Sequence, residues 1–111
     1  MDAVLLESVG RYIKGLPSTS EKSQISRYID RQIELGPILK RPVSAPLKSG
    51  IHELRPGAHR LLFFFHKGSI VICHAFRKRT DRVPDREIVA ALSSRARYMR
   101  EVGDGDALEK I

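Results

Sequence analysis

Residues 60–76 read RLLFFFHKGSIVICHAF and decide the fold of this chain. Two runs rich in β-branched and aromatic residues, 60–66 and 69–76, flank Lys67-Gly68, a pair typical of a tight hairpin turn. Large apolar side chains stand on both alternating faces of the first run, as in a central strand that is buried on both sides. The stretch therefore predicts an antiparallel hairpin at the centre of a sheet.

A further strand is predicted just before this hairpin. Residues 51–55 form a short run, and Pro56-Gly57 supplies a turn, because proline presets its own φ and glycine accepts a positive φ. The segment before it, 37–50, is interrupted by prolines and is expected to be a connection with little regular structure. Strands joined by such short turns make an antiparallel meander.

Helices are predicted on both sides of the strands. Apolar residues recur at helical spacing over 3–16 and again over 18–36. Ser18 and Glu21 have the pattern of a capping box at the start of the second helix. A third helix is predicted over 84–99, with proline in its first turn.

This order of elements predicts an α+β fold. A small antiparallel β-sheet of three to four strands would be packed against two N-terminal helices and a C-terminal helix. Because such a sheet needs cover on its apolar face, the helices are expected to pack there and to leave the other face free. The 111 residues suffice for one domain, placed at 1–103 and followed by a flexible C-terminal tail at 104–111.

The composition narrows the class of protein. Cys73 is the single cysteine, so no intramolecular disulfide is possible, and its apolar neighbours predict a buried, inert thiol. One cysteine also excludes a cysteine-based zinc motif. No apolar run approaches the roughly 20 residues that span a bilayer. The start of the chain lacks the basic pattern of a signal peptide, so a cytoplasmic protein with no membrane partner is expected.

The positive charge is concentrated in the middle of the chain. From Lys40 to Arg82 there are ten Lys and Arg residues against two acidic ones, whereas the whole chain carries a net charge of +7. Clustered cations favour a polyanionic partner, because binding releases the counterions condensed on a phosphate backbone. A solvated basic surface with no specific ligand is the alternative that charge alone leaves open.

Basic residues flank the predicted strands at one end of the sheet. Arg55 ends the first strand of the meander, Arg60 begins the second and Arg77-Lys78-Arg79 follows the third, so these groups should converge. Guanidinium groups there could stabilise the charge that builds on a phosphate when a neighbouring 2′-hydroxyl attacks it, a reaction that needs no metal. A histidine, or a lysine crowded by other cations, could carry the proton.

These residues form the candidate site. His74 lies in an apolar strand, so a hydrogen-bonded core histidine is the alternative interpretation of that residue. His59, beside a turn, is the histidine best placed to contact phosphate. No metal site is expected. The catalytic candidates are Arg55, Arg60, Lys78, Arg79 and His74, and the RNA-binding candidates are Lys48, His59, Arg77 and Arg82.

Several motifs, in order, resemble the RelE/HigB toxin superfamily, and most closely its phage-derived, host-killing HigB-like branch. LKSGIHELR at 47–55 is similar to the family's L-x-x-G-[LI]-x-E-L-R stretch, and a strand beginning with arginine follows at 60–65. HAFRKRT at 74–80 is similar to H-x-F-x-K-[KR]-T, and PDREIVAA at 84–91 to P-x-x-E-I-x-x-A. The resemblance covers about residues 4–98.

The resemblance implies a RelE-like fold and a toxin that cleaves mRNA, often on the ribosome, without metal or cofactor. It also implies a small helix-turn-helix antitoxin as partner. It marks Arg55 and Arg60 as phosphate-facing arginines, and Lys78 with Arg79 as a basic pair. Two departures stand out. The chain is expected to begin too late to hold a full copy of the N-terminal strand of many members. Arg79 replaces a frequent lysine and cannot act as a base at neutral pH.

Two other functions fit the same features. A non-catalytic nucleic-acid-binding regulator could use the same basic edge, and a ParE-like branch with this fold poisons a DNA topoisomerase. The grouped Lys, Arg and His residues favour the endoribonuclease, or mRNA interferase, because topoisomerase poisoning does not need clustered phosphate-stabilising cations.

Overall fold

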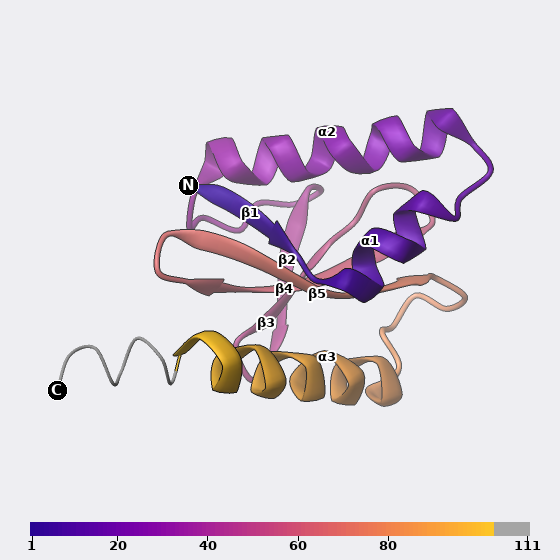
Figure 1. Ribbon diagram of the computed structural model, residues 1–111. Coiled ribbons are helices and arrows are strands. Elements are labelled where there is room, and N and C mark those ends of the chain that lie inside the picture. The colour runs from indigo at the N-terminus through magenta and orange to yellow at the C-terminus, as the bar shows by residue number, and fades with distance from the viewer. Residues whose placement is uncertain (104–111) are drawn as a thin grey trace, which may run out of the picture.

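Residues 1–103, which the computed structural model describes, form a mixed five-stranded sheet flanked by helices (Figure 1). The tail predicted at 104–111 lies outside the described residues. The strand order is β1-β5-β4-β3-β2. The elements are β1 (Asp2–Leu5), α1 (Glu7–Lys14), α2 (Thr19–Leu35), β2 (Ser44–Lys48), β3 (Ile51–Leu54), β4 (His59–His66), β5 (Ser69–Arg77), α3 (Asp85–Tyr98) and the π-helical η1 (Met99–Gly103). The α+β class is confirmed, whereas the expected number and arrangement of strands are wrong.

The predicted meander is present as β3, β4 and β5. Both β3 with β4 and β4 with β5 pair in the antiparallel sense. Lys67 and Gly68 form the turn between β4 and β5 with φ values of 47° and 80°, the positive values that a two-residue hairpin turn requires. The hairpin predicted for residues 60–76 is thus confirmed.

The chain was expected to begin too late to hold a full N-terminal strand, but the four residues of β1 form one and bring the sheet to five strands. β1 runs parallel to β5, with Asp2 opposite Ser69. The amide of Leu6 extends this pairing by donating to the carbonyl of Ile72 at 3.0 Å, and α1 starts only at Glu7, later than predicted. The first residues do fit helical spacing, but pairing with β5 satisfies their backbone groups without a helix.

A second strand, β2, lies in the segment that was expected to lack regular structure. It pairs antiparallel with β3, Ser44 opposite Leu54, and a bulge interrupts the pairing between Pro46 and Lys48. β2 is at the edge of the sheet, where the missing N–H of a proline breaks no ladder hydrogen bond. The expectation of an irregular connection is therefore wrong for residues 44–48.

Local chemistry sets the ends of α2. The Oγ of Ser18 accepts a hydrogen bond from the amide of Glu21 at 3.2 Å, which confirms one half of the predicted capping box. The Glu21 carboxylate binds two side chains of the sheet. Gly36 ends the helix with a φ of 67°, a left-handed conformation that glycine adopts without strain.

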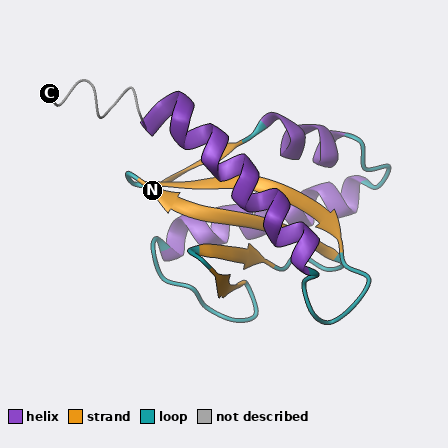
Figure 2. Ribbon diagram, turned by 90° about the horizontal axis from the view of Figure 1, so that it is seen from below, coloured by secondary structure: helices purple, strands orange, loops and turns teal. Residues whose placement is uncertain are grey.

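The helices lie on both faces of the sheet. On one face, Val9 of α1 and Ile25 of α2 pack in a buried cluster with Phe63. On the other, Ala91 of α3 packs in a separate cluster with Phe64, and Figure 2 shows α3 lying across the sheet. The expectation of one free face is therefore wrong, and polar chemistry is confined to the strand ends and the rims of the sheet.

The composition predicts a buried, inert cysteine and no membrane-spanning segment. Burial raises the pKa of the Cys73 thiol to about 12, which keeps it protonated at neutral pH, as expected for a buried, inert thiol. Among residues 1–103, no helix has both the length and the apolar character needed to cross a bilayer.

Candidate functional site

The sheet brings the backbones of the predicted basic residues to one end. His59 pairs with Arg77 across β4 and β5, and the amide of Lys78 donates to the carbonyl of Ala58 at 2.7 Å. Arg55 directly follows the last residue of β3 at the same end. The side chains then diverge into separate groups, because successive residues of a strand point to opposite faces of the sheet.

One group, the α3-side cluster, spans β3, β4, β5 and α3. Glu53 is opposite Leu62, and Leu62 is opposite His74, so Glu53 and His74 lie on the same face, two strands apart. Leu62 belongs to the buried cluster under α3, which identifies that face. The α3-side cluster consists of Glu53, Arg55, Arg60, His74 and Glu87.

Glu53 and Arg55 form an ion pair within this cluster. The Nη1 of Arg55 lies 2.9 Å from Oε1 of Glu53. The Glu53 residue is only 5% exposed, whereas the Arg55 side chain is 32% exposed. The second carboxylate oxygen of Glu53, Oε2, is buried and has no hydrogen-bond partner within residues 1–103. A buried carboxylate oxygen without a donor is costly, so it calls for a specific explanation.

Arg60 is buried beside this pair. Its Nη1 donates to the carbonyl oxygens of Gly57 and His59 at 2.8 and 2.7 Å. Burial lowers the pKa of the Arg60 guanidinium and the positive charge of Arg55 lowers it further, while Glu53 acts in the opposite direction. An arginine remains cationic under such shifts, so Arg55 and Arg60 concentrate positive charge at this end of the sheet.

His74 is held by a carboxylate from α3. Its Nε2 lies 2.8 Å from Oε1 of Glu87, and its ring stacks on Phe76 at a centroid distance of 5.8 Å. A carboxylate accepts hydrogen bonds, so Nε2 carries the proton and Nδ1 is the acceptor nitrogen of the neutral ring. Both side chains are partly exposed. The arrangement is that of an oriented acid–base histidine.

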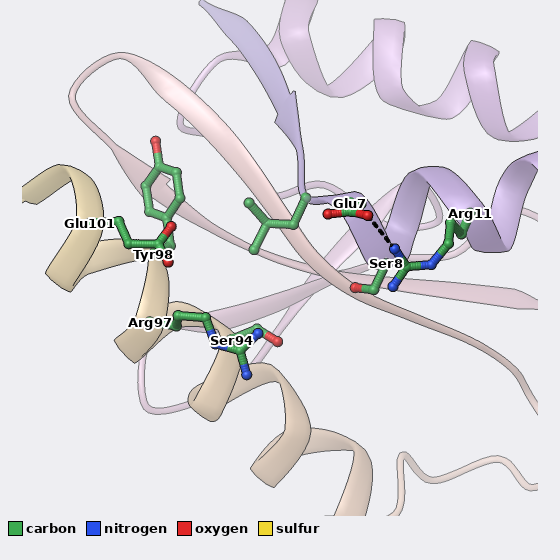
Figure 3. A pocket seen from close by; sticks show the side chains of 8 residues that line it. Glu7, Ser8, Arg11, Ser94, Arg97, Tyr98 and Glu101 are labelled. Carbon is green, nitrogen blue, oxygen red and sulfur yellow. Dashed lines mark hydrogen bonds and ion pairs between the residues drawn. The ribbon is translucent and has the colours of Figure 1, made fainter.

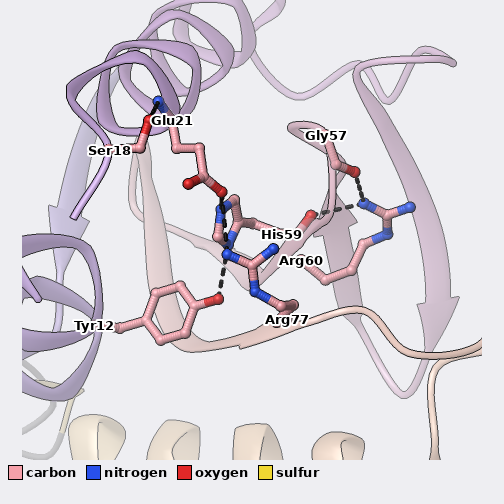
Figure 4. Close-up of polar contacts among 7 residues, drawn as sticks. All are labelled: Tyr12, Ser18, Glu21, Gly57, His59, Arg60 and Arg77. Atoms are coloured by element: carbon pink, nitrogen blue, oxygen red, sulfur yellow. Dashed lines mark hydrogen bonds and ion pairs between the residues drawn. The ribbon is translucent and has the colours of Figure 1, made fainter. Parts of the chain in front are cut away.

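A different group, the α2-side cluster, consists of Tyr12, Glu21, His59 and Arg77 (Figure 4). The Tyr12 hydroxyl lies 2.7 Å from Nδ1 of His59, and Oε1 of Glu21 lies 2.7 Å from its Nε2. Arg77 Nη2 also donates to Oε1 of Glu21, at 3.1 Å. His59 is 1% exposed with both ring nitrogens engaged, so this predicted phosphate contact lies buried between the helices and the sheet.

The α2-side cluster makes stability depend on pH. Hydrogen bonds from His59 and Arg77 lower the pKa of Glu21 from its ordinary value of 4.5. A carboxylate whose pKa is lowered on folding contributes stability above that ordinary value, and the contribution is lost as the pH falls through the folded-state pKa. Urea denaturation of wild type and Glu21→Gln from pH 7 to pH 3 should therefore show a steeper acid loss in the wild type.

The control for this comparison is Glu34→Gln, which removes an exposed ion pair with Arg31 on α2. Its acid profile should follow that of the wild type, because exposed pairs contribute little. Parallel profiles for wild type and Glu21→Gln would contradict the prediction.

The remaining predicted residues lie in the loop after β5 and on β2. Lys78 Nζ is 3.4 Å from Asp81, and Arg79 is exposed. Lys48 and Arg82 line a shared cavity of about 210 Å³ between β2 and the start of α3. Asp85 also lines this cavity and lies 3.4 Å from the Nζ of Lys48. The structure thus brings together two of the predicted RNA-binding residues.

A second cavity, of about 260 Å³, lies between the start of α1 and the end of α3 (Figure 3). Glu7, Arg11 and Arg97 are among its lining side chains, and none of the predicted site residues lines it. Within the described part of the chain, no group of three or more His, Cys, Asp or Glu side chains is arranged to hold a metal ion.

The residue predictions omit two members of the α3-side cluster. Glu53 and Glu87 both fall inside the motifs that carry the family resemblance. They were not predicted as site residues, because the prediction was based on clustered cationic residues and histidines. Their partners, Arg55 and His74, are among the predicted residues. Acidic residues in a basic segment are the signal that could have identified them.

Comparison with known proteins places the chain in a family. Residues 11–96 match the family model described as phage-derived protein Gp49-like. The search of curated proteins gave no match. The family match supports the RelE/HigB superfamily, while the HigB-like branch stays a prediction. The chain belongs to the phage-derived Gp49-like family, within the clan of RelE/HigB-like toxins.

Proposed function

We propose that this protein is the toxin of a type II toxin–antitoxin system and that it cleaves mRNA without a metal ion. The observation that carries the proposal is the α3-side cluster, in which two arginines and a histidine oriented by a carboxylate share one face of the sheet. Membership of a family within a toxin clan supports the toxin part of the proposal.

The proposed chemistry is attack by a ribose 2′-hydroxyl on the adjacent phosphate. Negative charge builds on the phosphoryl oxygens as the new bond forms, and Arg55 and Arg60 would stabilise it. Guanidinium groups suit this role, because their planar donors match phosphate oxygens in pairs. The partly exposed Arg55 is the one that can reach a bound phosphate directly.

His74 is the proposed general acid. In its protonated form, Nε2 stays bonded to Glu87 and Nδ1 carries the proton that the departing 5′-oxygen needs. Because Glu87 fixes the ring, the donor nitrogen is aimed before the substrate arrives.

The rest of the basic surface would bind the flanking RNA. The proposed contacts are Lys48 and Arg82, which share a cavity, and the exposed Arg79. Such contacts position RNA without reading its sequence. We propose ribosome-bound mRNA in the cytoplasm as the substrate, and a helix-turn-helix antitoxin as the partner that restrains the protein.

The test is induction of the protein in bacterial cells, followed by primer extension on cellular mRNA. Wild type should arrest growth and produce discrete new 5′ ends inside coding regions. Arg55→Ala should lower the cleavage rate by about 10²- to 10³-fold, the loss typical of removing one transition-state donor. Arg31→Ala, which breaks an exposed ion pair on α2, is the matched control and should cleave like the wild type.

Two results would contradict the proposal. Intact mRNA accompanied by double-strand DNA breaks would identify a topoisomerase poison. Intact mRNA and intact DNA, with RNA retained on the purified protein, would identify a non-catalytic regulator.

A further inference from the structure

We propose that Glu53 is the base that takes the proton from the attacking 2′-hydroxyl, and that the scissile phosphate uncovers it by drawing Arg55 away. The inference rests on the proposed function and assigns one further catalytic residue to it. It starts from the unpartnered Oε2 of Glu53.

The two carboxylate oxygens of Glu53 have different environments, which suits a base that acts only when substrate is bound. Its Oε1 is bound by Arg55, whereas its buried Oε2 has no donor within residues 1–103. Because a buried, unpaired acceptor has lost its hydrogen bonds to water, a hydroxyl donor that reaches it forms an especially favourable hydrogen bond. The 2′-hydroxyl of RNA is such a donor, and DNA lacks it.

Glu53 and His74 are spaced for a proton relay across one phosphate. They share a face and are separated by the single residue Leu62 of β4. Neighbouring strands lie about 4.8 Å apart, so their backbones are roughly 10 Å apart. In-line displacement puts the attacking and leaving oxygens on opposite sides of phosphorus, and each needs a partner within about 3 Å. Leu62 itself is fully buried under α3, so the phosphate would be held at the strand ends beside Arg55, where both side chains could reach it.

Arg55 can leave Glu53 when a phosphate binds. Its side chain is partly exposed and is bound to Glu53 through one contact of 2.9 Å. A phosphate offers a guanidinium two parallel charge-assisted hydrogen bonds and so competes well for it. Arg60, fixed by the carbonyls of Gly57 and His59, stays in place during this exchange.

The proton and bond balance is complete. The 2′-oxygen forms a bond to phosphorus while its proton passes to Oε2 of Glu53. The bond from phosphorus to the 5′-oxygen breaks, and that oxygen takes a proton from Nδ1 of His74. The products are a 2′,3′-cyclic phosphate and a 5′-hydroxyl, and a proton exchange with water resets both side chains.

The experiment compares wild type, Glu53→Gln and Glu34→Gln in single-turnover cleavage of a short RNA between pH 4.5 and pH 8.5. Glutamine preserves the shape of Glu53 and can still accept a hydrogen bond from Arg55, but it cannot take the proton. Its rate should fall by about 10²- to 10⁴-fold, and the rise of rate with pH on the acid side should disappear. Glu34→Gln should retain both.

The pH profile is interpreted with the charged and titratable groups around Glu53. These are Arg55, which follows β3, Arg60 of β4, and His74 of β5 with its partner Glu87 of α3. Tyr28 of α2 also acts electrostatically on Arg60. His74→Ala removes the proposed acid, whereas Glu53→Gln removes the proposed base. Loss of the acid side of the profile in Glu53→Gln, and not in His74→Ala, is therefore the result expected of the base.

A second measurement covers the case in which Glu53→Gln does not fold. Wild-type protein with ¹⁵N-labelled arginine is titrated with the same oligonucleotide carrying a 2′-deoxyribose at the scissile position, which cannot react. The Arg55 side-chain signal should shift, whereas the Arg60 signal should move little. An unchanged Arg55 signal at saturation would overturn the uncovering step.

The two proposals fail in different ways. If the wild type does not cleave RNA, the proposed function fails. If the wild type cleaves and a folded Glu53→Gln cleaves within about threefold of it with the same pH profile, Glu53 is not the base and the function stands.

Discussion

Replacing His74 by alanine is expected to lower the rate of RNA cleavage by about 10²- to 10⁴-fold, the usual contribution of a general acid. The histidine lies on β5, on the face that carries Arg55, and its Nε2 is bound to Glu87, so Nδ1 is the nitrogen proposed to deliver the proton. Without the imidazole, the 5′-oxygen must leave without a proton. The measurement is single-turnover cleavage of an end-labelled RNA at pH 7.

His66→Ala is the matched control for this experiment. His66 ends β4 at the hairpin turn, at the opposite end of the strand from the candidate site, and its ring contacts Tyr98. Its loss should leave the cleavage rate near that of the wild type. Glu87→Gln should show a smaller drop than His74→Ala, because it removes the group that orients the ring and leaves the ring itself. Equal rates for wild type and a folded His74→Ala would remove the histidine from the mechanism.

Replacing Phe63 by alanine is expected to reduce the free energy of unfolding by about 3–5 kcal/mol. The side chain is fully buried in β4, where its ring makes edge contacts with Phe65 and His52. Truncation leaves a cavity that the sheet and the helices packed on it cannot close. Since small domains are stable by only about 5–15 kcal/mol, the variant should lose a large part of its stability.

Urea denaturation followed by circular dichroism measures this loss. Val89→Ala on α3 is the control, because Val89 is 61% exposed and its truncation should change the free energy by no more than about 0.5 kcal/mol. A change below about 1 kcal/mol for Phe63→Ala would show that β4 does not form the core of the sheet.

Local patterns predict the parts of this fold that depend on neighbouring residues. The hairpin over 60–76 follows from two apolar runs around Lys67-Gly68, and the start of α2 follows from Ser18. β1 escapes prediction because its stability comes from pairing with a segment more than sixty residues away. β2 escapes it because Pro46 weakens the local strand signal, although an edge strand tolerates proline.

The candidate site, too, could be predicted only in part from the sequence. The meander topology predicts that Arg55, Arg60 and the residues after β5 meet at one end of the sheet. It does not predict which partners these side chains find, because Glu21 and Glu87 arrive from helices whose placement depends on tertiary packing. The family resemblance selects the right segments, but the pairing of each cation with a carboxylate requires the three-dimensional structure.

The parallel pairing of β1 has a consequence for synthesis of the protein. Asp2 leaves the ribosome well before its partner Ser69, which lies more than sixty residues further along the chain. Closing so long a loop carries an entropic cost that is repaid only when β5 has formed. In the nascent chain β1 therefore stays unpaired until β5 has been made. The pairing of β1 with β5 then forms together with part of the proposed catalytic site. A nascent chain that still lacks β5 would also lack His74, so it could not yet carry out the proposed cleavage.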